Sequence, residues 1–503
     1  HKMIERWCHQ SERAKGMARG DVDKVLDGWF LHKWLGLPLF FLLMFAVFWI
    51  SMGIGQLLQG VLEPLLQLLA IQVPTLLIQH YELPFYVEVC IAQGIGLSLV
   101  TALSFFPVLL VMFFALHMLE ESGYMTRAAV VMDRIMRALN LPGESMVALV
   151  LGLGCNVPGI LATRHIPRKS DKIVTALMMP FMSCGARLTI FAVFASVFFP
   201  QRAASVLFFL YVLGISIAFV TGLLARYAGL VKERGSDGYL LEIPAYQWPS
   251  LSMGLQQAWR RSQRFVWRAL GVIMPVCLVL ALCNHVSTAG QILVHPGDQS
   301  ILACLGKSLS LVFYPIGLEK RHWPLVVSLL MGLLAKEVVI TTLSVFYTQM
   351  NTHTVVAAQG IDVLLRDCMT EIVGNIGHWY AYFIPSMSTD IPAWAPYLNL
   401  QNISADAVMG YLIFTLLYFP CVSTLYATAR QVGWRWAGIS VLWSTAAAYI
   451  CAGTYLILSR YMNQHIWGVV GLAVVLLLLY GLKEVVKTIL AHNTIKKSHH
   501  TAA

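Results

Sequence analysis

The sequence predicts an all-α polytopic membrane protein with about ten transmembrane helices, organised as two repeats that contain broken helices. Hydrophobic residues make up 58% of the 503 residues and charged residues 12%, against about 25% charged in a soluble domain. Apolar runs of about 20 residues, the length of a membrane-spanning helix, recur along the chain. A transmembrane β-barrel would instead alternate apolar and polar residues over strands of about ten residues.

The basic residues gather in short segments between the apolar runs, and the net charge is +10. Such segments are expected to face the cytoplasm, which places both tails on that side of the membrane. This distribution is typical of a membrane protein and does not indicate nucleic-acid binding. The segments contain Arg164, Arg168, Lys169 and Lys172, then Arg226, Lys232 and Arg234, then Arg260, Arg261, Arg264 and Arg268, and finally Lys483, Lys487, Lys496 and Lys497.

Sequence motifs exclude several classes of enzyme. The ten cysteines form no C-x-x-C pair, which argues against a disulfide framework, a zinc ribbon and a thiol redox enzyme. The chain has no H-E-x-x-H motif of a metalloprotease and no G-x-x-x-x-G-K-[ST] phosphate loop. We therefore expect no enzymatic activity from these residues, and a membrane-embedded thiol enzyme is the least favoured alternative.

The apolar runs and polar connections divide the chain into six parts. We expect residues 61–80 to form an interfacial helix and residues 323–347 to form one span. The chain begins at His1, which suggests a piece of a longer protein. The parts are 1–30, the end of a cytosolic helical linker; 31–103, a first span with interfacial helices; 104–230, the first repeat; 231–264, a cytosolic loop with a basic amphipathic helix; 265–460, the second repeat, including an extramembranous segment at 349–403; and 461–503, a last span with a basic tail.

An internal repeat links the two halves. When Met146–Ile160 is set against Val326–Ile340, Gly152 falls opposite Gly332 and Asn156 opposite Lys336. Each segment is followed by a span interrupted at proline and cysteine. Paired, interrupted hydrophobic segments in two halves indicate a transporter whose site lies at the repeat interface near the bilayer midplane. We expect the two repeats to be inverted relative to each other.

Three cysteines, Cys155, Cys184 and Cys421, fall at the predicted helix breaks, beside Asn156 and Ser183. Sulfur together with neutral oxygens and freed backbone carbonyls favours a softer divalent metal over Mg²⁺ or Ca²⁺. The residues alone leave Fe²⁺, Mn²⁺, Co²⁺ and Zn²⁺ open. They also leave open a plain structural role, in which glycine and cysteine simply allow close helix packing.

Further candidates for the pathway or its gate are charged residues within or beside spans and the prolines at the breaks. A charge inside a span costs about 2.5–3.5 kcal/mol on insertion scales, so it is a functional candidate as well as a candidate internal ion pair. Acidic residues at a span end are usually only solvated, but one could act as a ligand where the ion enters. The candidates are Lys336, Glu337, Glu120, Glu121, Pro158, Pro180 and Pro420.

A series of short motifs resembles the FeoB family of bacterial ferrous iron transporters, in order and over nearly the whole chain. The motifs are Leu31-His32-Lys33-Trp34-Leu35-Gly36, Leu119-Glu120-Glu121-Ser122-Gly123-Tyr124, Gly154-Cys155-Asn156-Val157-Pro158, Pro180-Phe181-Met182-Ser183-Cys184-Gly185, Ala335-Lys336-Glu337-Val338-Val339 and Tyr418-Phe419-Pro420-Cys421.

The resemblance implies Fe²⁺ transport across the bacterial inner membrane, with gate cysteines at Cys155, Cys184 and Cys421. It also implies an N-terminal G domain that binds GTP and Mg²⁺, a small cytosolic accessory protein and a possible homo-oligomer as partners. GTP and Mg²⁺ would act only through that domain, which these residues do not contain. The alternatives are a nucleoside-type carrier and a transporter of another divalent metal, and a channel mechanism stays open beside a pump.

Two features depart from the family pattern. Arg430 is followed by Gln431 where the family often has glutamate, which removes an acidic ligand or switch at that position. The C-terminal tail ends in histidine and lysine without the cysteine cluster that some members carry.

Overall fold

The computed structural model confirms an all-α fold: the described residues form helices and no strand, apart from an isolated bridge between Ser287 and Ser300. The residues that the structure describes are 27–32, 35–82, 84–136, 139, 141–229, 246–287, 291, 299–333, 336, 338–351, 361–377 and 403–461. Most of the predicted linker at 1–30, the predicted span at about 466–490 and the basic tail lie outside these residues.

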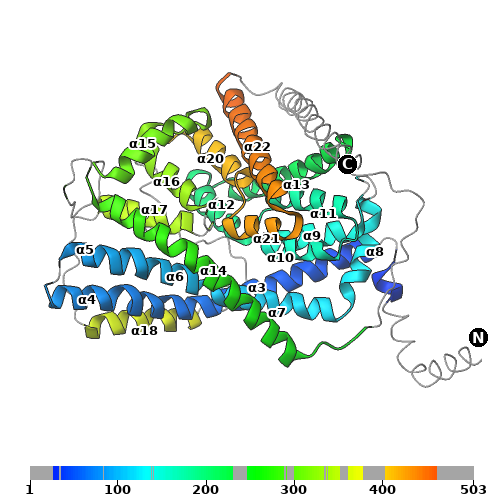
Figure 1. The fold of residues 1–503 in the computed structure, drawn as a ribbon, viewed down its shortest axis with the longest axis horizontal. Coiled ribbons are helices and arrows are strands. Elements are labelled where there is room, and N and C mark those ends of the chain that lie inside the picture. Colours follow the sequence, from blue (N-terminus) through cyan, green and yellow to red (C-terminus); the bar gives the residue numbers. More distant parts are fainter. Residues whose placement is uncertain are drawn as a thin grey trace, which may run out of the picture.

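The first part of the chain forms a long antiparallel hairpin. Its first arm comprises α3 (Gly36–Gln67), η1 (Leu68–Gln72) and α4 (Val73–His80), and its second comprises α5 (Phe85–Glu88), η2 (Val89–Gly96) and α6 (Leu97–Ser104). Figure 1 shows the two arms side by side, with α18 (Ile361–Gly377) along the first. The prediction of a separate interfacial helix at 61–80 is wrong, because α3 continues through Pro64 and π-helical turns at η1 carry it on to His80.

The second arm leads into α7 (Phe106–Glu121), which meets α8 (Tyr124–Met136) at a sharp elbow. Gly123 makes this turn with a φ of 77°, a left-handed conformation that glycine adopts without strain. α8 is amphipathic, with Arg127 and Asp133 among the buried apolar residues Ala128, Ala129 and Met132.

The first repeat contains two broken segments, as predicted. α9 (Gly143–Gly154) and α10 (Asn156–Ala162) meet at Cys155, and the 3₁₀ turn η4 (Thr163–His165) follows. α11 (Lys169–Met178), the 3₁₀ turn η5 (Met179–Phe181) and α12 (Gly185–Phe198) make the second segment. The unbroken α13 (Ala203–Tyr227) completes this part.

The second repeat differs from the prediction in two places. α14 (Leu251–His285) is one continuous helix, so the expected boundary at residue 264 between a cytosolic helix and a span falls inside it. The expected single span at 323–347 is instead broken into α16 (Trp323–Met331) and α17 (Val338–Asn351). Lys336 therefore sits at a helix break, where buried backbone groups need partners, and not inside a regular helix.

The other helices of this half are α15 (Ile301–Phe313), α20 (Ala405–Leu417), α21 (Val422–Val432) and α22 (Trp434–Tyr461). The break between α20 and α21 at Tyr418–Cys421 matches the prediction. Within the described residues, seven helices are long and apolar enough to cross a membrane, or eight if the pair Ile301–Ile316 and Lys320–Met331, bent by 117°, counts as one span. The total of about ten spans stays a prediction.

The largest buried cluster draws residues from both repeats. Phe181 and Phe194 of the first repeat lie with Tyr411 and Leu416 of the second in one contiguous core. Trp443 Nε1 of α22 donates a hydrogen bond to Thr221 Oγ1 of α13 at 2.9 Å. The broken segments of the two halves thus lie in the interior of one packed unit, with α10 packed against α21.

Candidate functional site

The break at Cys155 is a single extended residue between two helices. Cys155 has φ −156° and ψ 133°, and its carbonyl oxygen accepts a hydrogen bond from the Gly159 amide at 3.3 Å. Close packing on both sides requires glycine: a Cβ at Gly152 or Gly159 would lie 2.5 or 2.8 Å from Met179 Sδ. The glycines therefore let η5 approach the break directly, which supports the predicted packing role of small residues.

The second break of this repeat ends at Cys184, the N-cap of α12. The Cys184 carbonyl oxygen accepts hydrogen bonds from the Arg187 and Leu188 amides at 3.0 and 3.2 Å. A Cβ at Gly185 would lie 4.0 Å from the carbonyl oxygen of Gly154. The residue before Cys155 and the residue after Cys184 are thus close neighbours. A Cβ at Gly152 would likewise lie 3.4 Å from both Asn156 Oδ1 and Met182 Cβ, so the fold brings the two predicted breaks together.

Two side-chain oxygens at this junction are buried without a hydrogen bond. Asn156 Oδ1 and Ser183 Oγ have no hydrogen-bond partner of acceptable geometry, although Ser183 lies beside Tyr211. Both residues are at most 5% exposed. Buried polar atoms in native proteins are nearly always paired, so such oxygens indicate a place for a water, an ion or a ligand.

The freed backbone carbonyls of the second break have a partner that the sequence analysis did not identify. Arg187 is 1% exposed, and its Nη1 donates hydrogen bonds to the carbonyl oxygens of Pro180 at 2.8 Å and Met182 at 3.2 Å. These two carbonyls are therefore not open to a metal in this structure. The available signal was a charged residue inside an apolar run, which is costly in a membrane unless it is paired.

The equivalent break of the second repeat is capped in the same manner by Lys336. Its Nζ donates a hydrogen bond to the Phe419 carbonyl oxygen at 3.1 Å and lies 3.4 Å from the centre of the Tyr418 ring. Lys336 is 4% exposed. The Val422 amide donates to the Leu333 carbonyl oxygen at 3.0 Å, which ties the two breaks of this repeat together. Glu337 lies outside the described residues.

The three candidate cysteines stand at helix starts or breaks, as predicted, but they do not form a closed metal centre. Cys421 Sγ lies 3.0 Å from Thr424 Oγ1 within its own helix turn. Among the described residues, no group of three histidine, cysteine or acidic side chains is close enough to hold a metal ion. The metal set Cys155, Cys184, Cys421, Ser183 and Asn156 therefore stays a prediction.

The candidate prolines occupy the breaks themselves. Pro158 lies in the first turn of α10, Pro180 in η5, and Pro420 immediately before Cys421, and all three are buried. Proline fixes φ and lacks an N–H group, so it fits helix starts and disfavours a continuous helix across the break.

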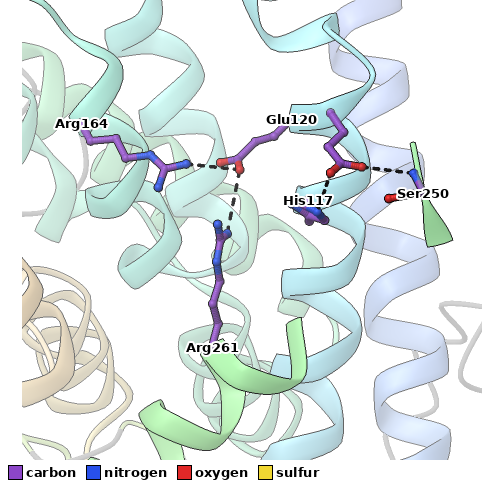
Figure 2. Close-up of polar contacts among 6 residues, drawn as sticks. His117, Glu120, Arg164, Ser250 and Arg261 are labelled. Atoms are coloured by element: carbon purple, nitrogen blue, oxygen red, sulfur yellow. Dashed lines mark hydrogen bonds and ion pairs between the residues drawn. The ribbon is translucent and has the colours of Figure 1, made fainter. Parts of the chain in front are cut away.

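Glu120 and Glu121 lie at the C-terminal end of α7, where each is engaged by other segments (Figure 2). Glu120 Oε2 lies 3.5 Å from Arg164 Nη2 and 3.9 Å from Arg261 Nη1 of α14. Glu121 Oε1 lies 3.0 Å from His117 Nε2, and its Oε2 accepts a hydrogen bond from the Ser250 amide at 3.2 Å. Both carboxylates thus link the first repeat to the start of α14.

The same junction contains a histidine with a perturbed pKa. Partial desolvation and the positive charge of Arg164 lower the pKa of His165 from its usual 6.5, while Glu120 acts in the opposite sense; the side chain itself is exposed. Arg164 Nε donates a hydrogen bond to His165 Nε2 at 2.9 Å, which requires that nitrogen to be unprotonated.

This geometry predicts a pH dependence of stability. Because the folded pKa of His165 is lowered, its neutral form favours folding fully above about pH 6.5, and this contribution is lost as the pH falls below that value. We expect the melting temperature of the purified chain to fall more steeply between pH 7.5 and 5.5 than that of His165→Gln. His80→Gln, at an exposed histidine far from this junction in sequence, is the control. Equal pH slopes for the chain and His165→Gln would contradict the prediction.

Comparison with known proteins gives matches along most of the chain. The family model described as "Gate: Nucleoside recognition" matches residues 102–198 and 266–435, which is over half of the chain. The model "Ferrous iron transport protein B C terminus" matches residues 207–261. The chain belongs to the FeoB family of gate proteins. The gate match includes all the candidate cysteines and both capping cations.

Curated FeoB proteins extend the match along most of the chain. The Fe(2+) transporter FeoB of Legionella pneumophila (strain Lens) is 36% identical over 433 residues, which are 84% of this chain and 57% of the relative. That of Salmonella typhimurium is 37% identical over 463 residues, 88% of this chain and 58% of the relative. The chain thus spans somewhat more than half the length of these relatives. No solved structure matches it.

Proposed function

We propose that this chain moves Fe²⁺ across the bacterial inner membrane through a midplane site between the two gate repeats. The relatives that it resembles are Fe(2+) transporters. The observation that carries the proposal is the pair of buried oxygens at the junction of two cysteine-containing breaks: Asn156 Oδ1, which has no hydrogen-bond partner, and Ser183 Oγ, which has only the Tyr211 side chain beside it. Such atoms suit an ion that has shed part of its water.

The proposed site combines soft and neutral ligands. Cys155 and Cys184 would supply sulfur, and Asn156 and Ser183 would supply oxygen to Fe²⁺ as the transported substrate. Cys421 would contribute from the second repeat, because α21, which it caps, packs against α10. Glu337 follows Lys336 directly in sequence and is our candidate for a compensating negative charge.

Lys336 would act as the gate of the second repeat. Its ammonium group holds the Phe419 carbonyl oxygen, a backbone acceptor that a passing cation could use. Fe²⁺ and Lys336 cannot occupy this position together, since like charges repel strongly in a low-dielectric interior. Passage therefore requires the ammonium group to withdraw, which a movement of one repeat against the other would achieve.

Several parts of the proposal reach beyond the residues of this chain. We infer that GTP and Mg²⁺ act on the gate through an N-terminal G domain, and that a small cytosolic accessory protein and a second copy of the chain can associate with it. Both tails would face the cytoplasm, as the basic segments indicate. The G domain would bias the repeats between two arrangements rather than contact the ion.

Fe²⁺ uptake by cysteine variants tests the proposal. Cys155→Ser and Cys184→Ser are each expected to reduce uptake of radioactive Fe²⁺ by at least about 10-fold, because even outer partners of a metal typically cost 10–100-fold when removed. Cys277→Ser and Cys451→Ser are matched controls, since both cysteines lie within unbroken helices. Uptake that is preserved in both gate variants, at equal expression, would exclude a ligand role for these thiols.

A nucleoside carrier is the second candidate, because the gate model is itself described as nucleoside recognition. Competition separates it from metal transport. We expect Fe²⁺ uptake to be inhibited by Co²⁺ or Mn²⁺ and unaffected by excess uridine or adenosine, whereas a nucleoside carrier would give the reverse.

A further inference from the structure

The N-terminal half of α14 presents an exposed stripe of arginine and tryptophan. Arg260, Arg264 and Arg268 recur at intervals of four residues, so they form one row on the helix surface, and all three are exposed. The adjacent row contains Trp259 and Trp267, which are 50% and 66% exposed. In Figure 1, α14 is the long green helix that crosses the others.

These three arginines have no acidic counterpart in the described parts of the chain: none of their guanidinium groups lies within ion-pair distance of a described carboxylate. Arg264 Nε donates a hydrogen bond to the Arg260 carbonyl oxygen at 3.0 Å. Arg261, by contrast, points to the inner side and lies 3.9 Å from Glu120. Most of the five N–H donors on each guanidinium of the outer row therefore face outward.

The row ends where the apolar part of α14 begins. Residues 269–285 contain no charged side chain, and at 1.5 Å per residue they extend over about 26 Å, close to the ~30 Å of a bilayer core. Arg268 lies 5.6 Å over the Tyr426 ring, whose centre is 6.5 Å from that of Trp434, the first residue of α22. Two spans thus enter the membrane at one level, marked by arginine and tryptophan.

We propose that this arginine row binds the headgroups of anionic phospholipids in the adjoining leaflet. Guanidinium groups pair with phosphate oxygens in a bidentate manner, and tryptophan side chains prefer the headgroup level. The exposed Trp267, next to Arg268, would lie at that headgroup level. Its position at the start of the apolar part of α14 favours a lipid surface over an acidic protein or a nucleic acid, which would leave the ring in water.

Lipid titration of the purified chain tests this site. Native mass spectrometry would measure the dissociation constants of the first bound phosphatidylglycerol and of phosphatidylcholine with the same acyl chains. We expect phosphatidylglycerol to bind more tightly. The expected loss is about fivefold for each arginine that is replaced by glutamine, as estimated from the attraction of one basic side chain to an anionic leaflet. Phosphatidylcholine binding should not change.

The matched control has the same change in net charge at exposed sites away from the stripe: Lys169→Gln, Arg202→Gln and Lys320→Gln. It should bind phosphatidylglycerol as the unmodified chain does. The proposal is overturned if the triple variant Arg260→Gln, Arg264→Gln, Arg268→Gln retains full preference for phosphatidylglycerol. It is also overturned if the control loses as much, or if millimolar inorganic phosphate displaces the lipid, which would indicate a site for free phosphate. Unchanged circular dichroism of the variants verifies that they are folded.

Discussion

Arg187→Met is expected to destabilise the protein more than any other single substitution at the helix breaks. Methionine removes the donors that satisfy the Pro180 and Met182 carbonyl oxygens, both in the buried core. Each buried carbonyl left unpaired costs about 1–3 kcal/mol. Relief of the desolvation cost of the guanidinium offsets part of this loss. We therefore expect a net loss of about 2–4 kcal/mol and a clearly lower melting temperature in detergent.

Two further variants separate the hydrogen bonds from the charge. Arg187→Lys keeps the charge but cannot span two carbonyls with one fixed planar group, so it should lie between the methionine variant and the unmodified chain. Arg202→Met removes an exposed arginine from the same repeat and should leave the melting temperature unchanged. If Arg187→Met and Arg202→Met have the same melting temperature, the carbonyls have other partners and the capping role is wrong.

Lys336→Met is expected to open a leak for divalent cations. A hydrogen bond from a charged donor is worth about 1.5–3 kcal/mol, and the contact with the Tyr418 ring adds to it. About 1.4 kcal/mol corresponds to a tenfold change in population, so the ratio of closed to open arrangements should fall by about 10- to 100-fold. Passive Fe²⁺ entry should therefore rise by about that factor.

Proteoliposomes that contain the chain and a metal-quenched dye would measure this leak. Lys320→Met, at an exposed lysine of the same half, is the control and should leave the flux at its original rate. Lys336→Arg should keep the gate largely closed, since it retains a cation at the Phe419 carbonyl oxygen. A Lys336→Met flux equal to that of Lys320→Met would show that the lysine is only a structural cap.

The predictions that depend on local chemistry were confirmed. Cys155 separates α9 from α10, and Tyr418–Cys421 separate α20 from α21, as the glycine and proline pattern indicates. Backbone breaks of this kind follow from the conformational limits of the residues themselves, so they can be predicted from short stretches. The break after Gly332 was not predicted, because residues 323–347 were expected to form one span.

In the first part of the chain, packing against neighbouring helices keeps a helix continuous where the sequence predicted two separate elements. Pro64 suggested an end to the first span, but α3, η1 and α4 continue to His80 because the second arm of the hairpin packs alongside. A Cβ on Gly96 would collide with the Ala70 carbonyl oxygen, which shows how closely the arms approach. The intrinsic preference of single residues for or against a helix is a weak guide where neighbouring helices pack this closely.

The sequence by itself determined the all-α membrane fold, the repeat, and the positions of the three helix breaks that contain cysteines, but not the break at Lys336. The tertiary structure alone decided which groups meet there. Arg187 and Lys336 take the freed carbonyls, and Glu120 faces two arginines. Asn156 Oδ1 is left without a partner, and Ser183 Oγ has only the Tyr211 side chain beside it. The reason is physical: a break is a property of a few adjacent residues, whereas the partner of a buried polar group is whichever distant segment the packing brings within about 3 Å.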